Sequence, residues 1–155
     1  MWSQQHAYPT FIVPKKDGRV RWVSDFRELN KMLVRVIYGI PCVRDIMARR
    51  KKYKYFAKLD LTMYFYTYEL DEESQLLCVI ITPFGKFKYF CLPMGICNSP
   101  DIAQQAMEEI FLDMRDDEVE TFIDDIGIFS MDFDVHMVKL KEVLTRWLHC
   151  KPTQV

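Results

Sequence analysis

The sequence has no apolar segment long enough to cross a membrane as a helix. Its longest unbroken apolar run, residues 76–81, has six residues, whereas a spanning helix needs about 20. The N-terminus lacks the basic and then apolar pattern of a signal peptide, and internal repeats and low-complexity linkers are missing as well. We therefore expect a soluble intracellular protein, cytoplasmic or nuclear, with no membrane partner.

Signals for a disulfide framework or a zinc site are also missing. The five cysteines, at positions 42, 78, 91, 97 and 150, are odd in number and form no Cys-x-x-Cys pair, and the three histidines are scattered. Both kinds of site need paired spacings. We expect reduced, mostly buried thiols and no zinc.

What the sequence does contain is enough apolar material for one domain or two small lobes. Of its 155 residues, 50% are hydrophobic and 14% are aromatic, which excludes a disordered polar tail.

The net charge of −1 conceals a strong asymmetry. Residues 1–58 contain 14 Lys and Arg against 4 Asp and Glu, whereas residues 59–155 contain 7 against 18. A basic half attracts polyanions such as nucleic acid or nucleotide phosphates, and an acidic half attracts cations. Two ordinary solvated faces explain the asymmetry equally well at this point.

Short apolar segments bounded by turn residues predict a mixture of strands and helices. The expected strands are residues 10–13 and 19–25, a hairpin around a turn at 16–18; residues 55–60, a buried strand; residues 75–82 and 87–92, a second hairpin; and residues 118–123 and 126–130. The expected helices are residues 42–52, a helix that starts at Ser99 and Pro100 with the Ser99 hydroxyl as N-cap, and residues 134–148.

The order of these elements predicts the fold class. In the last helix, the spacing of the apolar residues predicts that five side chains face inward: Val138, Leu140, Val143, Leu144 and Trp147. Because the elements do not alternate strictly as strand, helix, strand, we expect an α+β fold with an antiparallel sheet and helices packed on one face.

Three carboxylates carry the first functional signal. Asp124 and Asp125 lie between two apolar strand segments. Asp tolerates turn geometry, so an ordinary hairpin turn is an alternative explanation of this acidic pair. Asp60 ends another expected strand. If the two segments are neighbours in one sheet, three carboxylates meet at one edge, and their mutual repulsion favours bound cations. Hard oxygen ligands suit Mg²⁺, and two such ions support phosphoryl transfer.

Four motifs in this order resemble those of reverse transcriptases. They are Leu59-Asp60-Leu61 followed by Phe65; Leu92 to Gly95 with Ser99 and Pro100; Phe122 to Asp125; and, before them, the segment from Val23 to Lys31. The sequence is most similar to the polymerase of gypsy-type long-terminal-repeat retrotransposons, over residues 8–147. Each motif alone is weak, but four in the right order and spacing are specific.

The resemblance implies RNA-directed DNA synthesis and a role for each matching residue. Asp60, Asp124 and Asp125 are implied to be the catalytic carboxylates and, with the Leu61 carbonyl, to hold two Mg²⁺ ions, with Mn²⁺ as an alternative. The implied nucleotide-binding residues are Lys15 and Arg21 for the triphosphate, Phe65 as the gate against a 2′-hydroxyl, and Met94 and Gly95 beneath the base pair. The implied partners are a dNTP and an RNA or DNA template with its primer.

Each of these residues also has a simpler interpretation. Lys15 and Arg21 are compatible with hairpin surface charges, Phe65 and Met94 with packing, and the basic run 49–52 with a solvated helix face. Tyr64 departs from the family pattern beside the gate and is expected to crowd the nucleotide pocket.

The resemblance also implies a domain organisation. Residues 1–53 are expected to form a fingers-like basic segment, and residues 54–148 a palm-like catalytic segment with part of the fingers inserted at about 72–92. Residues 149–155 form a divergent tail, and we expect the thumb and ribonuclease H to be absent, as in a truncated element with a thumb-bearing or polyprotein partner.

Two rival functions stay open. One is an inactive retrotransposon remnant that at most binds nucleic acid, in which case the chain is not an enzyme. The other is an RNA-directed RNA polymerase, against which the aromatic gate at Phe65 argues.

Overall fold

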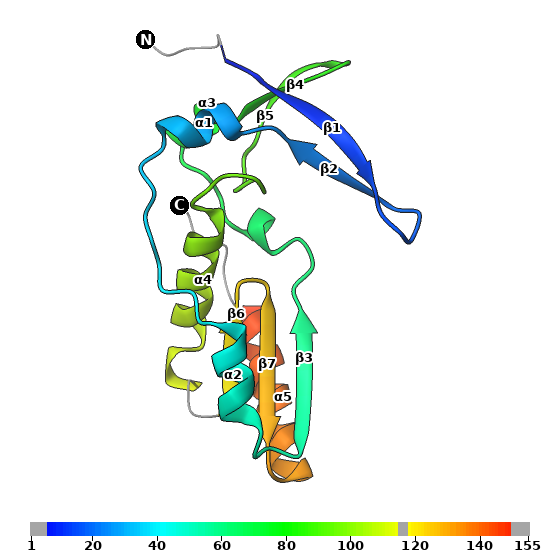
Figure 1. Cartoon of the computed structure of the whole chain (residues 1–155), viewed down its shortest axis with the longest axis vertical. Helices are drawn as coiled ribbons and strands as arrows, with labels where there is room; N and C mark the ends of the chain where they lie inside the picture. The colour runs from blue at the N-terminus through cyan, green and yellow to red at the C-terminus, as the bar shows by residue number, and fades with distance from the viewer. Residues whose placement is uncertain (1–5, 115–117, 150–155) are drawn as a thin grey trace. The chain divides into compact units, whose positions relative to one another are not determined.

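The computed structural model describes residues 6–114 and 118–149, which divide into two units (Figure 1). The first unit comprises residues 6–35 and 65–99. The second comprises residues 36–64, 100–114 and 118–149. Each unit has a sheet of its own.

The first unit is built on a four-stranded sheet. Its strands are β1 (Tyr8–Pro14), β2 (Val20–Ser24), β4 (Val79–Thr82) and β5 (Gly85–Lys88), in the order β2-β1-β4-β5. The β1–β2 and β4–β5 pairs are antiparallel, which confirms the two expected hairpins, and a parallel β1–β4 pair joins them. Helices α1 (Arg27–Met32) and α3 (Glu72–Leu77) belong to the same unit.

The second hairpin is shorter than expected, because residues 75–77 are helical. The Asp71 carboxylate accepts the Ser74 N–H at 2.6 Å and caps the start of α3. A capped helical turn satisfies backbone donors that a strand would leave to a neighbour. The strand therefore begins only at Val79.

The cysteines within the described residues form no disulfide. Cys78 is buried, and burial raises the pKa of its thiol to about 12. Cys42 is exposed, however, and Cys91 and Cys97 are half-buried. The expectation of mostly buried thiols was therefore wrong for these three, and position 150 lies outside the described residues.

The second unit is built on a three-stranded antiparallel sheet in the order β3-β7-β6. Its elements are α2 (Val43–Arg50), β3 (Tyr55–Asp60), α4 (Ser99–Ile110), β6 (Val119–Phe122), β7 (Asp125–Ser130) and α5 (Phe133–His149), with the short 3-10 helix η2 (Leu112–Met114). Another short 3-10 helix, η1 (Tyr64–Thr67), begins at the last residue of the stretch 36–64, and its residues 65–67 belong to the first unit. The bounds of β3 match the expected strand, but β3 is an edge strand. The expectation that it is buried was wrong, since the Phe56 side chain is 76% exposed.

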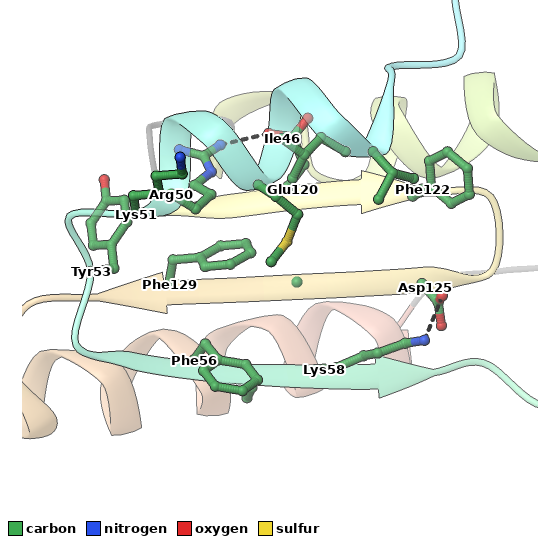
Figure 2. Close-up of a pocket in the computed structure, with 14 residues that line it drawn as sticks. Ile46, Arg50, Lys51, Tyr53, Phe56, Lys58, Glu120, Phe122, Asp125 and Phe129 are labelled. Atoms are coloured by element: carbon green, nitrogen blue, oxygen red, sulfur yellow. Dashed lines mark hydrogen bonds and ion pairs between the residues drawn. The ribbon is translucent and has the colours of Figure 1, made fainter.

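Helices cover the two faces of this sheet unequally. On one face Ile126 and Ile128 are fully buried, and α4 and α5 attach through Gln104 and His136, which bond to Thr121 and Ser130. The other face carries Phe129 and Glu120 and lies beneath α2 (Figure 2). The expected α+β class is confirmed, but the expectation that helices pack on one face was wrong for this sheet, because α2 lies over the second face.

The helix α4 begins at Ser99, as expected, although its hydroxyl has a different partner from the one expected. The Ser99 hydroxyl donates to the Pro93 carbonyl at 3.0 Å. It therefore ties the start of the helix to the preceding loop.

The buried stripe of α5 differs from the expected one. Val143 is fully buried and Trp147 is half-buried, but Val138 and Leu144 are exposed, so their expected inward positions were wrong. The buried stripe instead includes His136, whose ring lies against Tyr55. A polar residue in the stripe shifts the apparent apolar face. Within the described residues, no helix is long and apolar enough to cross a membrane.

Candidate active site

Asp60 and Asp125 lie directly opposite each other at one end of the second unit's sheet. The β3–β7 register pairs these two residues, and beyond them the Leu61 N–H donates to the Asp124 carbonyl at 2.9 Å. Side chains at directly opposite positions project from the same face with Cβ atoms about 5 Å apart. The expectation that both acidic segments belong to neighbouring strands is therefore confirmed.

The turn between β6 and β7 is held in an uncommon conformation. Phe122 pairs with Asp125, which leaves Ile123 and Asp124 at the turn. Ile123 has a φ of +54°, a left-handed conformation that a β-branched residue rarely adopts. The Gln104 side-chain oxygen accepts the Ile123 N–H at 2.6 Å, so α4 fixes the backbone that presents Asp124.

Gln104 supports the turn before Asp124, and the sequence analysis missed it. It is fully buried, and its amide nitrogen also donates to the Thr121 carbonyl, at 3.2 Å, and to Glu108. One signal in the sequence could have indicated this role: Gln104 is a polar residue on the apolar face of the helix, next to Ala103 and near Met107.

Lys58 is the second residue that the sequence analysis missed. Its ammonium nitrogen lies 2.8 Å from Asp125 Oδ2, while Asp125 Oδ1 is buried and has no hydrogen-bond partner among the described residues. The hydrogen bond with Asp125 raises the pKa of Lys58, and the charges of Asp60 and Asp124 raise it further. A cation is thus favoured at this end of the sheet.

The backbones of Asp60, Asp124 and Asp125 are neighbours, but their three carboxylate groups do not converge on one position. Among the described residues, no three His, Cys, Asp or Glu side chains gather closely enough to hold a metal ion. Asp125 contacts Lys58 instead. The Leu61 carbonyl accepts the Tyr64 N–H at 3.3 Å, and a carbonyl oxygen has a second lone pair for another partner.

A cavity of about 450 Å³ borders Asp125 on the α2 side of the sheet (Figure 2). Figure 2 shows the Lys58–Asp125 pair towards one end of the sheet and Arg50 towards the other. Arg50 contacts Glu120 at 2.5 Å and lies over the Phe129 ring.

This contact corrects the expectation of a wholly solvated run at residues 49–52. The Arg50 side chain is only 6% exposed. A guanidinium paired with a carboxylate is a charge that can be buried. Arg50 therefore fastens α2 over the sheet.

The expected nucleotide-binding residues belong to the first unit. Lys15 and Arg21 are exposed on the β1–β2 hairpin, where Arg21 pairs with Val13. Phe65 is half-buried in η1. Met94 and Gly95 are exposed in the loop that precedes α4.

The loop with Met94 and Gly95 is held by Asn30. The Asn30 amide donates to the Gly95 carbonyl at 2.8 Å, and its oxygen accepts the Cys97 N–H at 2.8 Å. Gly95 has a φ of +99°, and a Cβ there would lie 3.3 Å from the Ser24 carbonyl oxygen. Both its conformation and its surroundings favour glycine.

We expect Gly95→Ala to lower the free energy of unfolding by about 1–2 kcal/mol, because alanine is strained at this φ. The control is Gly39→Ala, since a Cβ at Gly39 meets no atom of the described residues within 4 Å. Urea unfolding of both variants measures the difference. Equal midpoints for the two variants would contradict a conformational requirement at Gly95.

Tyr64 does not have the surroundings that the sequence analysis expected. Its side chain is 1% exposed, its hydroxyl donates to the Ala103 carbonyl at 3.0 Å, and its ring centroid lies 5.6 Å from that of Trp147. The expectation that Tyr64 crowds a nucleotide pocket was therefore wrong, because it packs in the core of the second unit.

Comparison with known sequences identifies relatives along nearly the whole chain. The family described as "Reverse transcriptase (RNA-dependent DNA polymerase)" matches residues 13–151. The Pol polyprotein of transposon 297 from Drosophila melanogaster is 32% identical over 143 residues, which are 89% of this chain and 14% of that protein. A putative enzymatic polyprotein of cassava vein mosaic virus is 33% identical over 148 residues, 91% of this chain and 22% of that protein.

Solved structures share the fold. The native prototype foamy virus protease-reverse transcriptase has a TM-score of 0.81 and 27% identity, covering 95% of this chain and 20% of that chain. A foamy viral protease-reverse transcriptase in complex with double-stranded DNA has a TM-score of 0.86 at 22% identity, covering 95% of this chain and 26% of that chain. Because the family model matches residues 13–151, this chain belongs to the reverse transcriptase family of retrotransposon and retroviral Pol polyproteins.

Proposed function

We propose that this chain is the polymerase part of a gypsy-type retrotransposon reverse transcriptase, adding dNTPs to a primer 3′-hydroxyl on an RNA or DNA template. The observation that carries the proposal is the pairing of Asp60 with Asp125 beside a turn that presents Asp124. Carboxylates at one strand end are the ligands that a polymerase needs for phosphoryl transfer. Family membership and two similar transposon or virus polyproteins support the same assignment.

The donor chemistry of these residues fits a divalent cation. Asp60, Asp124 and Asp125 supply hard oxygen donors, and a Leu61 carbonyl lone pair is a fourth. The Lys58 ammonium, in the field of all three carboxylates, indicates that this position favours positive charge. We propose that these residues hold Mg²⁺, as two ions, with Mn²⁺ as an alternative. When bound, such ions activate the attacking hydroxyl and stabilise the leaving oxygen.

The remaining residues are proposed to bind and select the nucleotide. Lys15 supplies a point charge and Arg21 a forked guanidinium, both suited to a triphosphate. Phe65 excludes a 2′-hydroxyl by its bulk, and Met94 and Gly95 form the surface beneath the base pair. On this proposal residues 1–53 act as fingers and residues 54–148 as palm, with the fingers insertion at about 72–92.

The proposed partners are nucleic acids and further polypeptide. One foamy viral relative has been solved in complex with an RNA/DNA hybrid, and another with double-stranded DNA. The chain spans less than a quarter of each polyprotein compared above. We propose that a thumb-bearing partner or polyprotein segment holds the template duplex.

Nucleotide choice tests the proposed function. The chain is incubated with Mg²⁺ and an RNA template with a DNA primer, and extension is compared with dNTPs and with NTPs. We expect extension with dNTPs only. Equal use of both would favour an RNA-directed RNA polymerase. Salt-sensitive binding without any extension, unchanged when a thumb-bearing segment is supplied, would favour an inactive remnant.

A further inference from the structure

Lys58 and Asp60 lie on the same face of β3, two residues apart, next to Asp125 on β7. Asp125 and Gly127 are the residues opposite Asp60 and Lys58. The Lys58 side chain thus reaches diagonally across the strand pair to Asp125 Oδ2, at 2.8 Å. The ion pair lies beside the position where the three carboxylates adjoin.

The ion pair is of a kind that can exchange. The Lys58 side chain is 62% exposed and that of Asp125 is 28% exposed. Ion pairs with an exposed partner contribute little to stability, because water and salt screen them. The Asp125 carboxylate can also accept another partner, since in the part of the chain that the structure describes its Oδ1 atom has no hydrogen-bond partner.

Lys58 also occupies the electrostatic role of a bound cation. Within the described residues the acidic side chains do not converge on one point, while one of them contacts the lysine. A divalent ion held by all three carboxylates would lie close to the Lys58 ammonium, and two cations close together repel each other, which favours release of Lys58 from Asp125.

We propose that Lys58 is an internal counter-cation of the active site, which neutralises the acidic cluster when no metal is bound and competes with the divalent ion for Asp125. This inference rests on the proposed function. It makes Lys58 a positioning residue that sets metal affinity. The lysine keeps the carboxylates from repelling one another, and metal binding displaces it.

The experiment is a titration of the full chain with Mn²⁺ alone, in which electron paramagnetic resonance measures the free ion. Lys58→Met removes the charge and keeps the length of the side chain. Lys54→Met is the matched control, because Lys54 lies six residues before Asp60, about 20 Å along an extended strand. Urea unfolding verifies that the variants fold.

We expect Lys58→Met to bind Mn²⁺ about fivefold or more tightly than the wild type, because the ion no longer competes with an ammonium for Asp125, and the attraction of two unit charges about 4 Å apart in water corresponds to about that factor. Lys54→Met should stay within about twofold, since its charge is screened over that distance. On an Asp125→Asn background, Lys58→Met should gain far less, because the pair it breaks is already lost. Equal or weaker binding by Lys58→Met would overturn the inference.

Asp60→Asn in the same titration separates this inference from the proposed function. If Asp60→Asn loses the Mn²⁺ site, the carboxylates hold the ion, and the Lys58 variant alone decides the inference. If wild type and Asp60→Asn bind Mn²⁺ equally, or if neither binds it, the carboxylates hold no ion. Both the inference and the proposed metal site would then be overturned.

Discussion

Asp60→Asn and Asp124→Asn are each expected to lower dNTP incorporation about a thousandfold or more. If these carboxylates hold the metal as proposed, removing one forfeits several kcal/mol of transition-state stabilisation, and each 1.4 kcal/mol is a factor of ten in rate. The fold should be retained, since Asp60 is exposed and asparagine keeps the shape of the side chain. Primer extension and urea unfolding on the same preparations measure both quantities.

Asp45→Asn is the matched control for these variants. Asp45 is an exposed carboxylate on α2, in the same unit, and the same chemical change there should leave incorporation within about twofold. If Asp60→Asn and Asp124→Asn were as active as Asp45→Asn, the assignment of the catalytic carboxylates would be wrong.

Gln104→Leu is expected to destabilise the chain by about 2–4 kcal/mol and to reduce incorporation. Leucine leaves the Ile123 N–H without its acceptor and removes the donor to the Thr121 carbonyl. Each buried polar group left unpaired costs about 1–3 kcal/mol. The turn that presents Asp124 would also lose the contact that holds Ile123 at positive φ. Urea unfolding and single-nucleotide incorporation measure the two effects.

Gln105→Leu is the control for Gln104→Leu, because Gln105 is the next residue of α4 but is exposed and donates along the helix surface to Glu109. It should change stability by about 0.5 kcal/mol or less. Equal destabilisation by the two variants would attribute the effect to the helix rather than to the turn.

The acidic strand ends could be predicted from the sequence because they depend on local pattern. Residues 55–60 form a strand with the expected bounds that ends at Asp60. That Asp60 adjoins Asp124 and Asp125 was expected only on the condition that the two segments are neighbours in one sheet. Strand propensity and turn residues act over a few positions, which a sequence displays directly.

The supporting contacts could not be predicted, since they join residues far apart in the chain. Lys58 meets Asp125 and Arg50 meets Glu120 across about 70 positions of sequence. In the sequence, Arg50 is one of four basic residues in a row, and nothing local distinguishes the one that is buried. The expected position of Tyr64 depends on its sequence neighbour Phe65, whereas in the structure Tyr64 contacts Trp147 and Ala103, which lie far away in the sequence.

Metal removal tests the central claim most directly, namely that this chain is a divalent-metal-dependent polymerase whose carboxylates hold the ion. Single-nucleotide incorporation on an RNA template is measured with the wild-type chain in EDTA, and again after Mg²⁺ is restored. We predict no incorporation in EDTA and full recovery with Mg²⁺, saturating as the site fills. Incorporation that persists in EDTA, or fails to return with Mg²⁺, would contradict the claim.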